Sequence, residues 1–173
     1  MHFVTYGPFE LPRWNTLIDD DSEARDFFWS QSVEATAPGL ADAIGCYVFS
    51  IRTGGGSLPW YVGKTEIGFR NECFQAHKLK YYNKALAARV GSPVLFLIPK
   101  ITPANHRFAH RSTGNSDIEF LENYLIGRAL VRNDGLMNKQ NTRLLREIKF
   151  QGFMNSDPGH PGSAAIELRE ILD

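Results

Sequence analysis

Five features of the chain have side chains or spacing that suit phosphodiester chemistry. Two triplets place a tyrosine beside a glycine, Gly45-Cys46-Tyr47 and Tyr61-Val62-Gly63, and Arg70, Glu122 and Asn138 follow in that order. A tyrosine beside a glycine at a strand end is common, so each triplet alone says little. A guanidinium binds phosphate in a fixed orientation, and a carboxylate can hold a divalent cation. The ordered set therefore indicates metal-assisted cutting of a nucleic-acid backbone.

Glu122 carries the strongest single argument. The sequence predicts a helix over residues 117–132, whose apolar side is made by Ile118, Leu121, Leu125, Ile126 and Ala129. Glu122 lies on that side, with Ile118 and Ile126 at its i−4 and i+4 positions. A carboxylate turned toward a core is costly unless a charged partner meets it. A bound divalent cation would serve, and so would an internal salt bridge to Arg70 or Lys64.

A second long helix is predicted over residues 68–89. At 3.6 residues per turn one stripe of this helix contains Arg70, Phe74, His77, Tyr81 and Lys84. An arginine in a first helical turn opposes the helix dipole, which makes sense where an anion binds. The alternative is an arginine that only faces solvent, with His77 packed as an ordinary polar residue.

The elements that must position these side chains are short. Residues 44–51 and 60–62 are rich in β-branched and aromatic residues and predict two antiparallel strands joined by a flexible hairpin loop over 53–59. Residues 94–98 form an apolar run between two prolines and predict a buried third strand. An acidic helix is expected near residues 22–33, and residues 103–116 are expected to form a loop.

The composition suits a small globular enzyme. The chain has 173 residues, of which 43% are hydrophobic, and its formal net charge is zero. The charges are segregated. Residues 1–43 have two basic and eight acidic side chains (net −6), residues 44–150 have 16 and seven (net +9), and residues 151–173 have one and four (net −3). We therefore expect an acidic N-terminal extension with a helix, a basic central domain that suits a polyanionic partner, and a C-terminal extension with a short helix.

The location and the cysteines are also predicted. The start of the chain lacks the pattern of a signal peptide, and the longest apolar runs are too short to span a bilayer, so a cytoplasmic protein without a membrane partner is expected. Cys46 and Cys73 are predicted to be reduced thiols in or near the core.

The motifs resemble the GIY-YIG endonuclease family over roughly residues 44–141. The run Leu121–Ile126 resembles the glutamate helix of that family, and Leu136–Lys139 resembles the segment that carries its asparagine. The resemblance implies an α+β fold, with a small three-stranded antiparallel sheet flanked by helices in the order β-β-α-β-α. The hairpin is longer than in familiar members, and Arg70 lies one residue nearer the second triplet.

The resemblance also implies the roles of the site residues. Glu122 would hold one Mg²⁺ or Mn²⁺, Arg70 would stabilise charge on the phosphate, Tyr47 would act as general base, and Tyr61 would orient water or phosphate. A tyrosine base needs its pKa lowered, which Lys64 and Arg70 beside the metal would do. Lys64 and His77 complete the candidate catalytic set. Gly45, Gly63 and Asn138 would support the backbone, and the expected DNA contacts are Lys64, Arg70, Lys78, Lys84, Arg107 and Arg111.

Other interpretations remain open. A binding module on the same fold, without turnover, is the main alternative to a DNA endonuclease. Val62–Thr65 resembles part of a nucleotide-binding loop but lacks its first glycine, because Leu58 stands there. His106 and His110 have the spacing of helical zinc ligands, yet nearby proline and glycine argue against a helix. The sequence leaves open a homodimer or another protein partner.

Overall fold

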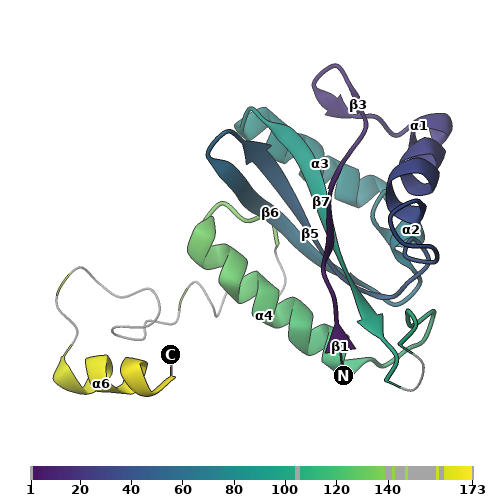
Figure 1. The fold of residues 1–173 in the computed structure, drawn as a ribbon. Helices are drawn as coiled ribbons and strands as arrows, with labels where there is room; N and C mark the ends of the chain where they lie inside the picture. The colour runs from purple at the N-terminus through teal and green to yellow at the C-terminus, as the bar shows by residue number, and fades with distance from the viewer. Residues whose placement is uncertain are drawn as a thin grey trace. The chain divides into compact units, whose positions relative to one another are not determined.

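The computed structural model describes residues 2–103, 106–138, 142, 147, 159 and 162–172. The chain divides into two units, Met1–Met137 and Asn138–Asp173. The second contains the helix α6 (Ser163–Leu172), within the expected C-terminal extension. All other elements described below belong to the first unit, which is a mixed α+β structure around an antiparallel sheet (Figure 1).

The sheet has three long strands and two short ones. The long strands are β5 (Gly45–Thr53), β6 (Gly56–Thr65) and β7 (Ser92–Ile101). The chain start adds β1 (His2–Phe3) and β2 (Tyr6–Glu10), which pair one after the other with the outer side of β7. The expectation of three strands was therefore incomplete, because the alternation of apolar residues in this start is too short to signal strands. The other edge of the sheet is β6.

The hairpin between the two tyrosines differs from its expected form. β5 and β6 remain paired as far as Thr53 and Gly56, so only Gly54 and Gly55 form the turn. The expected flexible loop over residues 53–59 was wrong. Gly56, directly after the turn, has a φ of +112°, a conformation that favours glycine, and both strands continue to the end of the hairpin. The hairpin is long because its strands are long.

The acidic helix near the N-terminus occurs as two continuous segments. The α-helix α1 (Ser22–Phe27) is capped by Asp21, whose carboxylate accepts a hydrogen bond of 2.9 Å from the Glu23 N–H. It continues as the π-helix η1 (Phe28–Glu34). Before it, β3 (Arg13–Trp14) and β4 (Leu17–Ile18) form a separate two-stranded ribbon.

The single helix expected over residues 68–89 is instead two helices. α2 (Phe69–Glu72) ends at Cys73, and α3 (Ala76–Ala88) starts after Gln75, whose backbone is extended. The Gln75 side chain donates hydrogen bonds to the Asn71 carbonyl and the Glu72 carboxylate, which stabilise the break. The break removes Arg70 from the helical face of α3.

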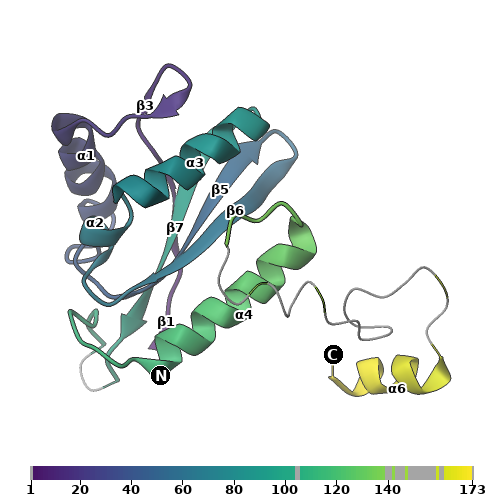
Figure 2. The ribbon, with the colours of Figure 1, turned by 180° about the vertical axis from the view of Figure 1, so that it is seen from behind.

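Helices cover both faces of the sheet (Figures 1 and 2). Tyr47, Phe49 and Ile51 of β5 face α2, α3 and η1 and belong to the larger core. Cys46, which precedes Tyr47 on β5, points to the opposite face of the sheet. There it packs with Ile118 of α4 (Ser116–Arg132) in a smaller core. Because side chains alternate along a strand, β5 and β6 contribute to both faces.

Cys46 and Cys73 are both buried and neither forms a disulfide. In the described part of the chain, no helix is long and apolar enough to cross a membrane.

Candidate functional site

The two motif tyrosines lie side by side on neighbouring strands, on the face that α3 covers. In the register, Tyr47 is opposite Gly63 and Phe49 is opposite Tyr61. The two tyrosine rings are 6.2 Å apart between centroids. The ring of Tyr47 lies directly over Gly63, and a Cβ at that position would overlap its phenol. Gly63 is therefore required for Tyr47 to lie where it does.

Lys78 connects Tyr61 to a carboxylate. Its ammonium group donates a hydrogen bond of 2.8 Å to the Tyr61 hydroxyl and lies 3.1 Å from a Glu72 carboxylate oxygen. The Lys78 and Glu72 side chains are only 9% and 16% exposed. The ammonium also lies 5.0 Å from the ring centroid of Tyr61 and 5.9 Å from that of Tyr47. A buried cation thus stands next to both phenols.

The pKa values follow from this arrangement. Burial lowers the pKa of Lys78, but the hydrogen bonds and charges of Tyr61 and Glu72 outweigh burial and raise it overall. Burial raises the pKa of Tyr61, and the Lys78 hydrogen bond opposes that rise. We conclude that the protein favours the charged form of Lys78, and that this ammonium group interacts mainly with the Tyr61 hydroxyl.

Tyr47 has a different environment. It is fully buried, and burial raises its pKa well above the ordinary value, with Tyr82, Cys73 and Tyr61 adding to the rise. Its hydroxyl interacts with that of Tyr82. Apart from this contact, neither hydroxyl has a hydrogen-bond partner in the part of the chain that the structure describes. Lys64 and Arg70 are not among the groups that shift the pKa of Tyr47 here, so the expectation that they lower it beside a bound metal stays a prediction.

Glu122 lies on the inner face of α4, among the buried residues Ile118, Ile126 and Ala129. Burial raises the pKa of Glu122, and the charges of Lys64 and Lys78 oppose the rise. The backbone of Lys64 also opposes the rise. Among the described strands β6 is the outermost on this side of the sheet, and α4 packs against it.

One cluster therefore surrounds the edge of β6. Tyr61 and Lys64 come from β6 itself, Lys78 and Glu72 come from the side of α3, and Glu122 comes from α4 on the other side. The charge of Glu122 acts on the pKa of Tyr61 as well, which places the two groups within electrostatic reach. The structure thus brings a carboxylate, two lysines and a half-buried phenol together.

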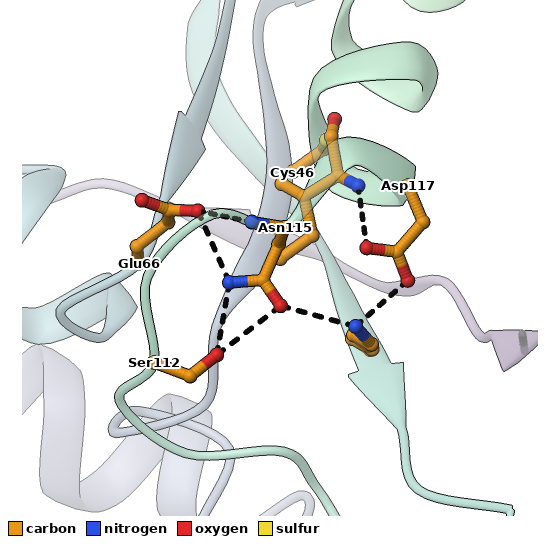
Figure 3. A network of polar contacts seen from close by, with 7 residues as sticks. Cys46, Glu66, Ser112, Asn115 and Asp117 are labelled. Carbon is orange, nitrogen blue, oxygen red and sulfur yellow. Dashed lines mark hydrogen bonds and ion pairs between the residues drawn. The ribbon is translucent and has the colours of Figure 1, made fainter.

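A polar network holds the start of α4 in place (Figure 3). The backbone N–H and side-chain amide of Asn115 donate to one Glu66 oxygen at 2.9 and 3.0 Å. Lys100 of β7 donates to Asn115 at 3.1 Å and pairs with Asp117 at 2.8 Å. The Asn115 hydrogen bonds lower the pKa of Glu66. Glu66 directly follows β6, and Lys100 lies on β7. The network therefore fixes α4, and with it Glu122, against these two strands.

Arg70 and His77 are not part of the cluster. The Arg70 guanidinium lies 3.7 Å from an Asp42 carboxylate oxygen and 5.9 Å from the ring of Trp29. His77 is exposed on α3. The break between α2 and α3 turns Arg70 away, and Lys78, one position after His77, faces inward in its place. Sequence analysis expected Lys78 on the surface and did not select Glu72. The available signal was the helical spacing, because Lys78 lies four residues before Tyr82 and both are buried on α3.

The other basic candidates lie on the surface. Lys84, Arg107 and Arg111 are exposed, and Lys64 is half-buried. Lys78 is buried and contacts Tyr61 and Glu72, so it lies inside the cluster and not on the surface. His110 is exposed, and a ring nitrogen lies 3.4 Å from the Asp42 carbonyl oxygen.

Two of the three supporting residues are explained by the structure. A Cβ at Gly45 would overlap the backbone of Ile98 on β7, so glycine is required there as at Gly63. Asn138 is buried and belongs to the second unit, where its carbonyl accepts a hydrogen bond from Thr142. In the first unit, Asn133 supports the backbone: its amide donates to the Pro59 carbonyl at 2.8 Å. Sequence analysis did not select Asn133.

No family model, no curated protein and no solved structure matches this chain. The resemblance to GIY-YIG endonucleases therefore rests on the sequence motifs and stays a prediction.

Few protein groups near Glu122 could act as metal ligands. Among the described residues, no group of three or more His, Cys, Asp or Glu side chains lies together. Mg²⁺ is commonly held by one or two carboxylates, with water and substrate phosphate completing its shell. Glu122 alone fits that kind of site, in which most ligands would come from water and substrate.

Proposed function

We propose that this chain is a metal-dependent endonuclease that hydrolyses phosphodiester bonds of DNA, with a single-metal site of the GIY-YIG type. The observation that carries the proposal is the position of Glu122. Its carboxylate is half-buried, its pKa is raised, and it lies within electrostatic reach of Tyr61, Lys64 and Lys78. A protein that only binds DNA does not need a carboxylate at this position. The negative charge of Glu122 would repel the DNA phosphates unless a cation lay between them.

The order of elements supports the same proposal. From Gly45 to Arg132 the chain runs through β5, β6, α2 with α3, β7 and α4. We infer that these elements correspond to the β-β-α-β-α core of the GIY-YIG type, with one helix broken into two. The N-terminal strands β1 and β2 would then be additions to that core.

The residues of this chain would divide the chemistry as follows. Glu122 would hold one Mg²⁺ or Mn²⁺, which when bound polarises a phosphate and acidifies water. Lys64 and Lys78 would offset the negative charge that grows on the phosphate oxygens. Water would add to phosphorus, and the leaving oxygen would depart with a proton.

The structure favours a changed role for the tyrosines. Tyr61 is half-buried, and its hydroxyl is held by Lys78, so it is the phenol placed to orient the attacking water or take its proton. Tyr47 is fully buried and its pKa is strongly raised. We therefore assign Tyr47 to support of the Tyr61 ring and not to the general base that the resemblance implied.

The test compares cleavage of supercoiled plasmid and branched DNA with Mg²⁺ or EDTA. Wild type should cut only with the metal, and Glu122→Gln should abolish cutting. Glu119→Gln is the matched control, because Glu119 lies exposed on the same helix. Tyr61→Phe should slow cutting by about 100-fold or more. Tyr47→Phe should have a smaller effect, and an equal loss in both would return Tyr47 to the catalytic set.

A non-catalytic DNA-binding module is the second candidate, and one observation favours it. Arg70, the expected phosphate ligand, is instead paired with Asp42 and lies over Trp29. Under this alternative, wild type would bind DNA in low salt to the same extent with Mg²⁺ or EDTA and would cut none of the substrates. Metal-dependent cutting that Glu122→Gln removes would exclude it.

A further inference from the structure

The outer face of α4 carries an exposed apolar stripe. Phe120, Tyr124 and Val131 are 74%, 55% and 81% exposed. Gly127 lies between them, and a Cβ placed on it would have no atom within 4 Å. These four residues have the spacing i, i+4, i+7 and i+11, so they form one straight line on the helix. The line is opposite the inner face that carries Glu122.

The spacing of this stripe is self-complementary. If two α4 helices run antiparallel, Phe120 of one copy lies opposite Val131 of the other, and Tyr124 lies opposite Gly127. Each pair occurs twice, because the sequence positions are symmetric about the middle of the stripe. A large side chain therefore always meets a smaller one, and the two tyrosines enter the open spaces that the glycines leave. Such alternation is what close packing of two helices along a narrow seam requires.

The charges at the helix ends agree with an antiparallel pair. The first turn of α4 contains the exposed Glu119, since Asp117 is paired with Lys100, and its last turn contains the exposed Arg132. An antiparallel arrangement brings the acidic start of each helix beside the basic end of the other, and it opposes the two helix dipoles favourably. A parallel pair would place like charges together. A hollow of about 420 Å³ beside the first turn, lined by Phe3, Phe120 and Leu121, gives the end of the second helix room to approach.

We propose that α4 forms a homodimer interface in which two copies of this chain pair antiparallel through Phe120, Tyr124, Gly127 and Val131. A second copy fits this surface because the same short segment supplies both the projecting rings and the spaces that receive them. The proposal does not rest on nuclease activity, because its residues lie on the face of α4 opposite Glu122. The seam is one helix long, which indicates a dimer that dissociates on dilution.

The test is sedimentation velocity of the full chain over a range of concentrations. Wild type should form a concentration-dependent dimer. Gly127→Leu should weaken it by about tenfold or more, because the new side chain occupies the space for Tyr124. Leucine is a better helix former than glycine, so loss of the fold does not explain that result. Tyr124→Glu should act in the same direction.

Val90→Glu is the matched control, because Val90 is 93% exposed and lies outside α4. It should leave the dimer unchanged. Circular dichroism verifies the fold of each variant. A wild type that stays monomeric at the highest concentration would overturn the proposal. So would a dimer that tolerates both α4 substitutions, or one that Val90→Glu disrupts as strongly.

Discussion

Replacement of Lys78 by methionine should destabilise the protein strongly although it keeps most of the side-chain volume. Lys78 and Glu72 are 9% and 16% exposed, and the ammonium also donates to the Tyr61 hydroxyl. Removing one partner of a buried ion pair costs about 3–5 kcal/mol, because the other charge stays buried without compensation. Glu72 retains some contact with water and a hydrogen bond from Gln75. We therefore expect the low end, about 3 kcal/mol, which lowers Tm by roughly 6–12 °C in a chain of this size.

The assay is urea unfolding at neutral pH for wild type, Lys78→Met, Glu72→Gln and the double variant. The double variant should be more stable than Lys78→Met alone, since it no longer leaves a carboxylate unpaired. Lys84→Met is the matched control on the exposed side of α3 and should change stability little. A cost for Lys78→Met within about 1 kcal/mol of zero, or single costs that simply add in the double variant, would refute the reasoning.

The same ion pair has a signed pH dependence. The pKa of Lys78 is raised above its usual 10.5 in the folded state. The charged form is therefore favoured by folding, and its contribution is fully present below the unfolded pKa and is lost as pH rises through the folded pKa. The stability difference between wild type and Lys78→Met should stay constant from neutral to mildly alkaline pH and shrink in strong alkali. A difference that already shrinks near neutral pH would contradict this assignment.

Three further predictions test other parts of the site. Gly63→Ala should destabilise by about 1–3 kcal/mol, because its Cβ overlaps the buried ring of Tyr47, whereas Gly54→Ala, which meets no atom within 4 Å, should not show that cost in urea unfolding. Glu122→Gln should stabilise the fold at neutral pH. The pKa of Glu122 is raised from 4.5 in the folded state, so folding favours its protonated form. The stability that this group contributes is fully present below pH 4.5 and is lost as pH rises through the folded pKa. The gain from Glu122→Gln, measured by urea unfolding, should therefore disappear in acid. Lys84→Ala should weaken DNA binding about equally for all sequences and reduce the slope of log affinity against log salt by about 1 in a titration.

Most of the central sheet and α4 could be predicted from local pattern. The run at residues 94–98 is apolar and lies between prolines, and it forms the middle of β7. The helix expected over 117–132 is observed as Ser116–Arg132 because its apolar positions repeat with a helical period. The short strands β1 and β2 could not be predicted, since their partner is β7, almost 100 residues later. Pairing over that distance leaves no local signal.

The direction of a site side chain could be predicted where it lies on a continuous helix. It could not be predicted where it depends on the interruption between α2 and α3. Glu122 faces inward because it lies on the apolar side of a continuous helix. Arg70 and Lys78 depend on Gln75, whose extended backbone separates α2 from α3. A continuous helix would have placed Arg70 and His77 on one face. Nothing in the helix propensities of this segment marks a stop, because the break is stabilised by side-chain hydrogen bonds that only the folded structure provides.

The distribution of unfavourable burial supports a functional interpretation of the β6 edge. Three groups there are costly for folding: the carboxyl of Glu122 with its raised pKa, and the hydroxyls of Tyr47 and Tyr82. Elsewhere in the described core, buried side chains are almost all apolar, and the Lys100–Asp117 pair is well satisfied. Strain and polar burial collect at functional sites because selection for binding or catalysis outweighs their cost. A cation at Glu122 would compensate the carboxylate whose charged form burial disfavours.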